Sequence, residues 1–419
     1  MSSDCYVYLQ MPASLEVVTA GRFRYEILSD GSALGRFVYG KKYLARPDAV
    51  PLDPYNLPLE PTEFRTTQLK GLFGALRDAA PDFWGRRVID RRHPTEDLTE
   101  FDYLVHPGGE RIGALSLGSE VEPPGPGSDG AIPGLHDLEG LRKVADQIEG
   151  DEPVDEEVFE LFKPGSSVGG ARPKTVITDA GSTWLAKFPQ RGDRWSNAPV
   201  EGGMLRLAAR CGIRVPAARV ETVGNENVLL VRRFDRNSVT GGELRHRMVS
   251  ALTVLDLDDG VIDRSGWSYL ALADELQRWS EEPLLDKQEL FRRIVLNALI
   301  SNTDDHPRNH ALLAPGRSWR LSPAYDLTPS ALRSLEHRDL AMTAGALGRI
   351  ASRQNLLSGA PRFGLQVADA TAIIDELRTI VDESWRAEIT GLGGSEEDCR
   401  AVRAAFLYPG FEIKRDPVG

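Results

Sequence analysis

The sequence predicts an α+β protein that is divided into two or three domains or lobes. Three observations support this class. The chain has 419 residues, which is more than one hydrophobic core usually organises. Short β-rich runs lie near its beginning, and amphipathic stretches with helical spacing lie further along. A segment rich in Pro and Gly at residues 119–130 has the composition of a linker between these parts.

The composition excludes several classes of protein. Hydrophobic residues make up 41% of the chain and charged residues 27%, which is typical of a globular protein. The net charge of −12 opposes tight, nonspecific binding to nucleic acid or anionic lipid. The three cysteines are too scattered for a disulfide framework or a cysteine-based zinc site. We find neither a leader pattern nor a stretch of roughly 20 apolar residues, and we expect a soluble cytoplasmic protein without a membrane partner.

The first part of the chain predicts a small sheet. Runs rich in β-branched and aromatic residues occupy residues 6–9, 22–27 and 35–39. Turn residues at 29–32 separate the last two runs. A helix is predicted over residues 81–89, with Pro81 in its first turn. We expect a β-rich N-terminal subdomain at residues 1–118 and a linker at 119–131.

A loop rich in Gly and Ser at residues 163–174 precedes two predicted strands, at 175–178 and 184–188. Glycine lets backbone N–H groups reach phosphate oxygens, because no side chain obstructs them. The loop matches neither the Walker pattern nor Gly-x-Gly-x-x-Gly, and taken alone it is more typical of an ordinary flexible loop. Its candidate phosphate-binding residues are Val168, Gly169 and Gly170.

Lys187 lies in the second of these strands. A predicted helix follows this strand and ends at Gly212. Glu201 is expected in the first turn of this helix. Protein kinases fix the α and β phosphates with a buried strand Lys paired to a helix Glu, so both residues are candidates for that pair. Alternatively, the Lys is solvated and the helix dipole alone favours the Glu. A further strand at 228–231 leads into residues 232–236, which suit a hinge between lobes.

The most informative stretch is an amphipathic helix, predicted over residues 290–300, that runs into the polar segment 301–309. Asp304 and Asn309 have the Asp-x-x-x-x-Asn spacing of a kinase catalytic loop, where the Asp receives the hydroxyl proton and the Asn helps to hold Mg²⁺. A predicted β-hairpin then brings Asp326 back beside Asn309. Carboxylate and amide oxygens suit Mg²⁺.

Two other interpretations of this stretch stay open at this point. Asp304, Asp305 and His306 could form a polar turn that simply ends a helix. They could also ligate the metal of a hydrolase, because Asp and His together can hold a catalytic metal ion. The chain has only seven histidines, and His306 has only His310 near it in sequence.

These motifs resemble HipA-type serine/threonine protein kinase toxins of type II toxin–antitoxin modules. The segments that carry the resemblance, in matching order and spacing, are residues 167–174, 186–189, 233–236, 302–309 and 322–326. The resemblance implies a two-lobed, protein-kinase-like fold with an added N-terminal β-rich subdomain. It also implies an N-lobe core at residues 132–236 and a mostly helical C-terminal lobe at 237–419.

The resemblance also implies the role of each site residue. Phosphorylation of Ser167, with Ser166 as the alternative, would eject the glycine-rich loop and inactivate the kinase, as in the family. The implied residues are Asp304 as catalytic base, Asn309 and Asp326 as metal ligands, and Lys187, Glu201, Phe234, Val168, Gly169, Gly170, His306 and Arg308 as nucleotide contacts.

ATP and Mg²⁺ are the implied cofactors. Family members commonly phosphorylate an aminoacyl-tRNA synthetase and pair with a small helix-turn-helix antitoxin, HipB-like, that binds operator DNA. The acidic charge of the chain agrees with a basic partner that supplies the DNA contact. Arg232 stands where an acidic hinge residue is expected, which leaves the nucleotide preference open. A kinase of small molecules or lipids, and a non-catalytic binding module in a repressor complex, are the alternatives.

Overall fold

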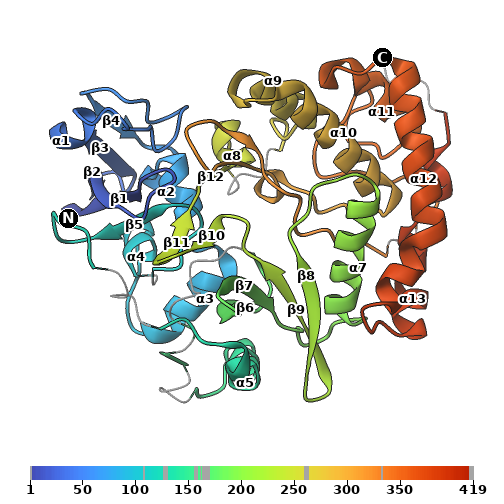
Figure 1. The fold of residues 1–419 in the computed structure, drawn as a ribbon, viewed down its shortest axis with the longest axis horizontal. Coiled ribbons are helices and arrows are strands. Elements are labelled where there is room, and N and C mark those ends of the chain that lie inside the picture. The colour runs from blue at the N-terminus through green and yellow to red at the C-terminus, as the bar shows by residue number, and fades with distance from the viewer. Residues whose placement is uncertain are drawn as a thin grey trace.

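The structure is a computed structural model, and its elements confirm the α+β class. Figure 1 shows the N-terminal sheet on one side of the molecule and the long helices α7 and α12 on the other. No helix in the described part of the chain is long and apolar enough to cross a membrane. The structure describes residues 2–106, 109–125, 131–154, 159–160, 162, 170–258, 264–331 and 334–414.

The N-terminal part contains an antiparallel five-stranded sheet with the order β4-β3-β2-β1-β5. The predicted strands are confirmed, and each begins earlier than expected. Alternate residues of β2 are buried, and Phe23 and Tyr25 pack there against Phe101. Its strands are β1 (Ser2–Gln10), β2 (Val17–Ile27), β3 (Ala33–Tyr39), β4 (Glu63–Thr66) and β5 (Leu115–Gly118).

The helices of this part of the chain are α1 (Lys41–Leu44), α2 (Gly74–Ala79), α3 (Phe83–Arg92) and α4 (Glu100–Val105), and α3 packs with α5 (Leu138–Glu149) of the next unit. The position predicted for Pro81 is wrong, because α3 begins at Phe83 and Pro81 lies outside it. Asp82 occupies the position before the first helical residue, yet its side chain makes no capping hydrogen bond. That carboxylate is directed elsewhere, as described below.

The next unit is an antiparallel sheet with the order β6-β7-β9-β8. Helix α5 (Leu138–Glu149), which the sequence did not predict, packs its apolar side against Val228 and Leu230, and α7 (Asn197–Arg210) packs near Leu229 and Val231. Alternate residues of β9 therefore face the two helices, which lie on different sides of the sheet in Figure 1. Its strands are β6 (Lys174–Asp179), β7 (Ser182–Lys187), β8 (Ala218–Val223) and β9 (Glu226–Arg232).

The rest of the chain contains more strands than the single hairpin that we predicted. These are β10 (Arg236–Val239), β11 (Gly242–Arg245), β12 (Arg247–Ser250), β13 (Ala311–Ala314) and β14 (Arg320–Leu321). The expected hairpin is β13 and β14, and β12 pairs with β13. The helices are α8 (Ala251–Val254), α9 (Tyr269–Trp279), α10 (Pro283–Leu299), α11 (Arg353–Gly359), α12 (Val367–Thr390) and α13 (Glu396–Val402).

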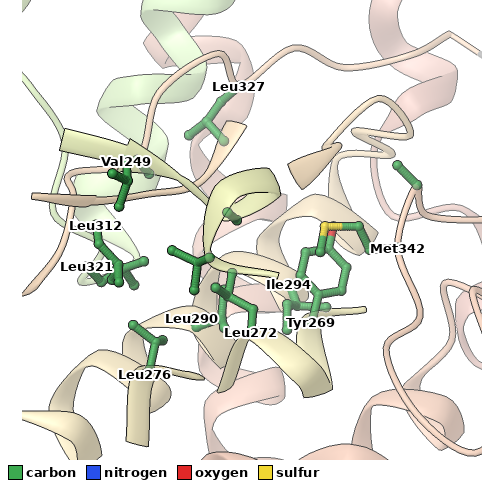
Figure 2. Packing of buried hydrophobic residues seen from close by; sticks show 14 of the residues in the cluster. Val249, Tyr269, Leu272, Leu276, Leu290, Ile294, Leu312, Leu321, Leu327 and Met342 are labelled. Atoms are coloured by element: carbon green, nitrogen blue, oxygen red, sulfur yellow. The ribbon is translucent and has the colours of Figure 1, made fainter. Parts of the chain in front are cut away.

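Helix α10 begins seven residues earlier than predicted, because Pro283 provides a first helical residue that needs no N–H partner. Its buried face meets α9 and the three-stranded sheet. Figure 2 shows this core, in which Leu290 and Ile294 of α10 lie near Leu272 of α9 and Leu312 of β13. The core supports the end of α10, from which the polar segment at 301–309 emerges.

Candidate active site

A largely buried lysine joins two carboxylates in the centre of the candidate site. Lys187 Nζ, at the end of β7, lies 2.5 Å from Glu201 Oε1 and 2.9 Å from Asp326 Oδ1. The Lys187 side chain is 12% exposed and that of Glu201 is 5% exposed. Lys187 is therefore not a solvated residue at a strand end, and the predicted Lys–Glu pair forms with Asp326 as a third member.

The position predicted for Glu201 within its helix is wrong. Helix α7 begins at Asn197, so Glu201 is its fifth residue and lies beyond the first turn. The helix dipole acts mainly within that turn, so it does not account for an acidic residue here. Burial raises the pKa of Glu201, and the Lys187 ammonium opposes this change. The contact with Lys187 explains the residue better than the helix dipole does.

The charges of the trio support one another. Burial would lower the pKa of Lys187, but Asp326 and Glu201 hold it above its ordinary value. The ammonium of Lys187 lowers the pKa of Asp326 well below its usual range, against partial desolvation and with help from Lys174 and His306, while 43% of the Asp326 side chain is exposed. Asp326 is therefore ionised at neutral pH and available to a cation.

The backbone at Asp326 has a left-handed conformation, with a φ of 58°. Asp tolerates this conformation better than most residues, and such strain persists only where the surroundings impose it. The Ala324 N–H donates to the Arg214 carbonyl at 2.7 Å, and the Tyr325 hydroxyl donates to the Arg308 carbonyl at 2.6 Å. The second bond ties the chain to the 301–309 segment after the β13–β14 hairpin.

Asp304 and Asn309 occupy the two ends of the polar loop. Asp304 is exposed, and partial desolvation and the nearby Asp326 raise its pKa, while His306 opposes this. Asn309 is buried in a short 3₁₀ turn (Pro307–Asn309), and its side-chain amide donates to the Asp304 carbonyl at 3.1 Å. Because that bond uses the amide nitrogen, the amide oxygen is the atom that could ligate a metal.

Asp305 has a different environment from its neighbour Asp304. Its buried carboxylate accepts hydrogen bonds from the Tyr269 hydroxyl and the Asn297 amide, each at 2.7 Å, and bonds His310 Nε2 at 2.8 Å. Asp305 thus anchors the loop to α9 and α10, a role that sequence reasoning missed. These contacts also argue against a hydrolase that uses Asp305 as a metal ligand.

His306 and Arg308 lie between these two aspartates and Asn309. The His306 ring packs edge-on against Trp267, with 6.4 Å between the ring centroids. Its Nδ1 is buried and has no hydrogen-bond partner among the described residues, which fits a site that takes a ligand. Burial raises the pKa of Asp82, and the positive charges of Lys174 and Arg308 oppose this change.

Phe234 follows β9 and packs on Tyr325, with 5.5 Å between the ring centroids. It therefore lies next to Asp326, while Arg232 at the end of β9 is exposed. The N–H of Gly170 donates to the carboxylate of Asp82. The other predicted loop residues, Val168, Gly169, Ser167 and Ser166, lie outside the described residues.

The residues present suit a nucleotide with a divalent cation. Asp326 and Asn309 offer the oxygen ligands that Mg²⁺ prefers, and Lys187 offers a fixed positive charge next to Asp326. Asp304 lies on the same loop as Asn309, with its carboxylate toward solvent.

Two family models match the chain. The model of the HipA-like C-terminal domain matches residues 166–385, and that of the HipA N-terminal domain matches residues 15–118. A Sinorhizobium fredii protein named "Putative kinase Y4mE" is 25% identical over 310 residues, which cover 70% of this chain and 71% of that protein. A Haemophilus influenzae protein named "Putative kinase" is 26% identical over 215 residues, which cover 46% of this chain and 62% of that protein.

Among solved structures, the chain is similar to one from Shewanella oneidensis MR-1. That structure is described as a toxin–antitoxin system of HipA, HipB and its operator DNA. The TM-score is 0.71 at 18% identity, and the match covers 96% of this chain and 94% of the Shewanella chain. At this identity the likeness concerns the fold, and it confirms the predicted HipA-like architecture.

Proposed function

Because the chain belongs to the family of HipA-like proteins, we propose that it is an ATP- and Mg²⁺-dependent serine/threonine protein kinase that acts as a toxin of a toxin–antitoxin module. One observation carries this proposal: Lys187 contacts both Glu201 and Asp326, and Tyr325 ties the Asp326 segment to the loop of Asp304 and Asn309. This set of charges matches what phosphoryl transfer requires.

Each residue has a proposed task. Asp304 takes the proton from the acceptor hydroxyl, and its exposure lets an acceptor protein reach it. Asn309 and Asp326 hold Mg²⁺, and Lys187, fixed by Glu201, binds the α and β phosphates. Bound Mg-ATP supplies the phosphoryl group. Phe234 lies against the adenine side of the nucleotide, supported by its packing on Tyr325.

The remaining site residues are part of the same proposal. His306 contributes a polar ring atom that has no hydrogen-bond partner in the described part of the chain, and Arg308 contributes a positive charge. We assign autophosphorylation to Ser167, with Ser166 as the alternative. The candidate nucleotide contacts in the glycine-rich loop are Val168, Gly169 and Gly170. In this structure the Gly170 N–H already donates to Asp82, so a contact with phosphate there would have to share or replace that bond.

The domain division also stays a proposal: a subdomain at 1–118, a linker at 119–131, an N-lobe core at 132–236 and a C-lobe at 237–419. Two observations support it. Strand β5 ends at Gly118, where the match to the N-terminal domain model also ends. The sheet formed by β6, β7, β8 and β9 lies wholly within 132–236.

We further propose a small, HipB-like helix-turn-helix partner that brings the complex to operator DNA. The similar Shewanella protein is described in a complex with HipB and operator DNA, and the net charge of −12 here calls for a basic partner at the DNA. The phosphorylated target is proposed to be a translation protein such as an aminoacyl-tRNA synthetase.

The first experiment is to incubate the purified chain with γ-labelled ATP and Mg²⁺, with and without cell extract, and to map the labelled peptides. Label on the Ser166–Ser167 peptide and on an extract protein, lost in Asp304→Asn, supports a self-regulated protein kinase. The purified chain must first be shown to be unmodified. If such chain then neither takes up label nor transfers it to an extract protein, the proposal is contradicted. That result would favour a non-catalytic module or a kinase of small molecules.

A further inference from the structure

Helices α3 and α4 bury their apolar sides in different hydrophobic cores. Trp84 and Val88 of α3 are buried in the cluster that also contains residues of α5, β6, β7 and β9. Phe101 and Leu104 of α4 are buried in the cluster that contains the N-terminal sheet. Polar and aromatic side chains join the two helices across the boundary between these cores.

One group of these joining contacts lies within α3. The Arg86 guanidinium donates to Glu100 Oε1 at 2.9 Å, and it lies over the Tyr103 ring at 4.5 Å from the centroid. The Tyr103 hydroxyl donates to the carboxylate of Asp90, one turn further along α3. These contacts fix α4 against α3.

Two histidines meet where the helices end. His93 follows the last residue of α3 and His106 follows the last residue of α4, and their ring centroids are 4.3 Å apart. His93 Nδ1 lies 2.8 Å from Glu96 Oε1. One ligand atom from each of these three residues lies within 4.8 Å of the other two, and the described part of the chain contains no second group of this kind.

The backbone presents these three side chains on hydrogen-bonded turns. The His93 N–H donates to the Ile89 carbonyl at 3.1 Å, and the Glu96 N–H donates to the His93 carbonyl at 3.1 Å. The His106 N–H donates to the Asp102 carbonyl at 2.9 Å. A ligand that binds all three side chains therefore has little backbone to order, which favours binding.

The donor set suits zinc. Zn²⁺ binds imidazole nitrogen and carboxylate oxygen at about 2.0–2.2 Å, which places the ligand atoms of a tetrahedral site about 3.3 Å apart. The three atoms here need to approach one another by about 1.5 Å at most to reach that spacing. Two imidazoles do not suit Mg²⁺ or Ca²⁺, which prefer oxygen ligands. The fourth position is open to water, because 57% of the Glu96 side chain is exposed.

We propose that His93, Glu96 and His106 form a zinc site that clamps the end of α3 to the end of α4. A metal ion there joins the two hydrophobic cores at their polar boundary. The site is separate from the Mg²⁺ ligands proposed at Asn309 and Asp326. This inference does not depend on the proposed kinase function.

The test is isothermal calorimetry with Zn²⁺ on the full chain and on His106→Ala, with excess Mg²⁺ present to occupy the site at Asp326. Changes beyond the ligands of a metal site already cost about 10- to 100-fold in metal affinity. Loss of a ligand should therefore weaken Zn²⁺ binding at least tenfold. His136→Ala, at an exposed histidine that pairs with Asp137, is the matched control and should bind Zn²⁺ as the wild type does.

Three further measurements keep the test decisive if His106→Ala folds poorly. Co²⁺ can replace Zn²⁺, and its visible absorption should report a tetrahedral site in the wild type and in His136→Ala. His106→Cys supplies a thiolate, which zinc also accepts, and should restore the affinity to within tenfold of the wild type. Addition of Zn²⁺ should slow amide hydrogen exchange at the ends of α3 and α4 in the wild type.

The outcomes separate this proposal from the kinase function. Wild-type chain that binds no Zn²⁺, or that binds it no more tightly than His106→Ala does, would overturn the zinc site. Binding of Zn²⁺ that leaves hydrogen exchange at the ends of both helices unchanged would overturn its role as a clamp. Chain that binds Zn²⁺ at this site but transfers no phosphoryl group would overturn the kinase function alone.

Discussion

Asp304 and Asp305 are neighbours in the sequence, but their carboxylates have different surroundings. Asp304 is exposed near His306 and Asp326, whereas three donors hold the carboxylate of Asp305 inside the protein. A proton acceptor must reach its substrate, and a structural anchor must not move. The exposed aspartate therefore fits the chemical step, and the buried one fits the support of the loop.

Asp304→Asn should lower phosphoryl transfer by about 10²- to 10⁴-fold, because an amide cannot accept the hydroxyl proton. ATP affinity should stay within about threefold, because the nucleotide contacts lie elsewhere. Transfer is measured with γ-labelled ATP and affinity by calorimetry. Asp274→Asn, at an exposed residue paired with Arg362, is the control and should transfer at the wild-type rate. Near wild-type transfer by Asp304→Asn would make the assignment wrong.

Asp326→Ala should affect binding as well as transfer. The change removes a proposed metal ligand and the carboxylate that lies 2.9 Å from Lys187 Nζ. In the wild type we expect Mg²⁺ to increase the affinity for ATP. In Asp326→Ala this increase should be at least tenfold smaller, which is measured by titrating ATP at several Mg²⁺ concentrations. An unchanged Mg²⁺ dependence would place the metal on other residues.

At the scale of elements, the candidate catalytic loop depends on its attachment to α9 and α10. Asp305→Ala leaves the Tyr269 hydroxyl, the Asn297 amide and the His310 ring without this acceptor in a buried place. We expect a loss of about 3 kcal/mol of unfolding free energy, measured as a lower urea midpoint. Asp304→Ala, at the exposed neighbour, should change stability by less than about 0.5 kcal/mol. Equal effects of both changes would contradict the division of roles.

Local patterns predicted the elements that carry the chemistry. The Asp304–Asn309 spacing, the strand of Lys187 and the β13–β14 hairpin each lie in one short stretch, where residue spacing is informative. The sequence could not predict that Asp82 reaches Gly170, 88 residues further along, because no periodicity marks a contact at that separation. It also missed α5 and placed Glu201 one turn too early, since helix ends are weakly signalled.

At the scale of the whole molecule, a buried ion network ties the N-terminal part to the strands that follow β9. Arg233 donates to Glu110 at 3.0 Å and to both oxygens of Asp235, at 3.0 and 2.7 Å. Arg236 adds a bond to Asp235 at 2.8 Å, and Arg245 adds one to Glu110 at 3.1 Å. The segment that the sequence suggested as a hinge is therefore firmly attached to the N-terminal part.

This network predicts how stability depends on pH. Burial alone would raise the pKa of Glu110, but Arg236, Arg233 and Arg245 hold it below its ordinary value, against the repulsion of Asp235. Burial also opposes the lowering of the pKa of Asp235, yet Arg233 and Arg236 hold it well below its usual range. Both carboxylates thus bind protons more readily in the unfolded chain. Their contribution is fully present above pH of about 5 and is lost progressively as the pH falls further.

Asp235→Asn tests this linkage, because it keeps the size of the side chain and removes the charge between two buried guanidinium groups. At pH 7 we expect a loss of about 3–5 kcal/mol, seen as a lower urea midpoint. As the pH falls toward 3, the wild-type midpoint should approach that of the variant, because Asp235 takes up a proton in the unfolded chain while it stays ionised in the folded protein. Asp274→Asn should follow the wild-type curve throughout. A constant difference between Asp235→Asn and wild type from pH 7 to 3 would show that packing, and not the charge of Asp235, joins the two parts.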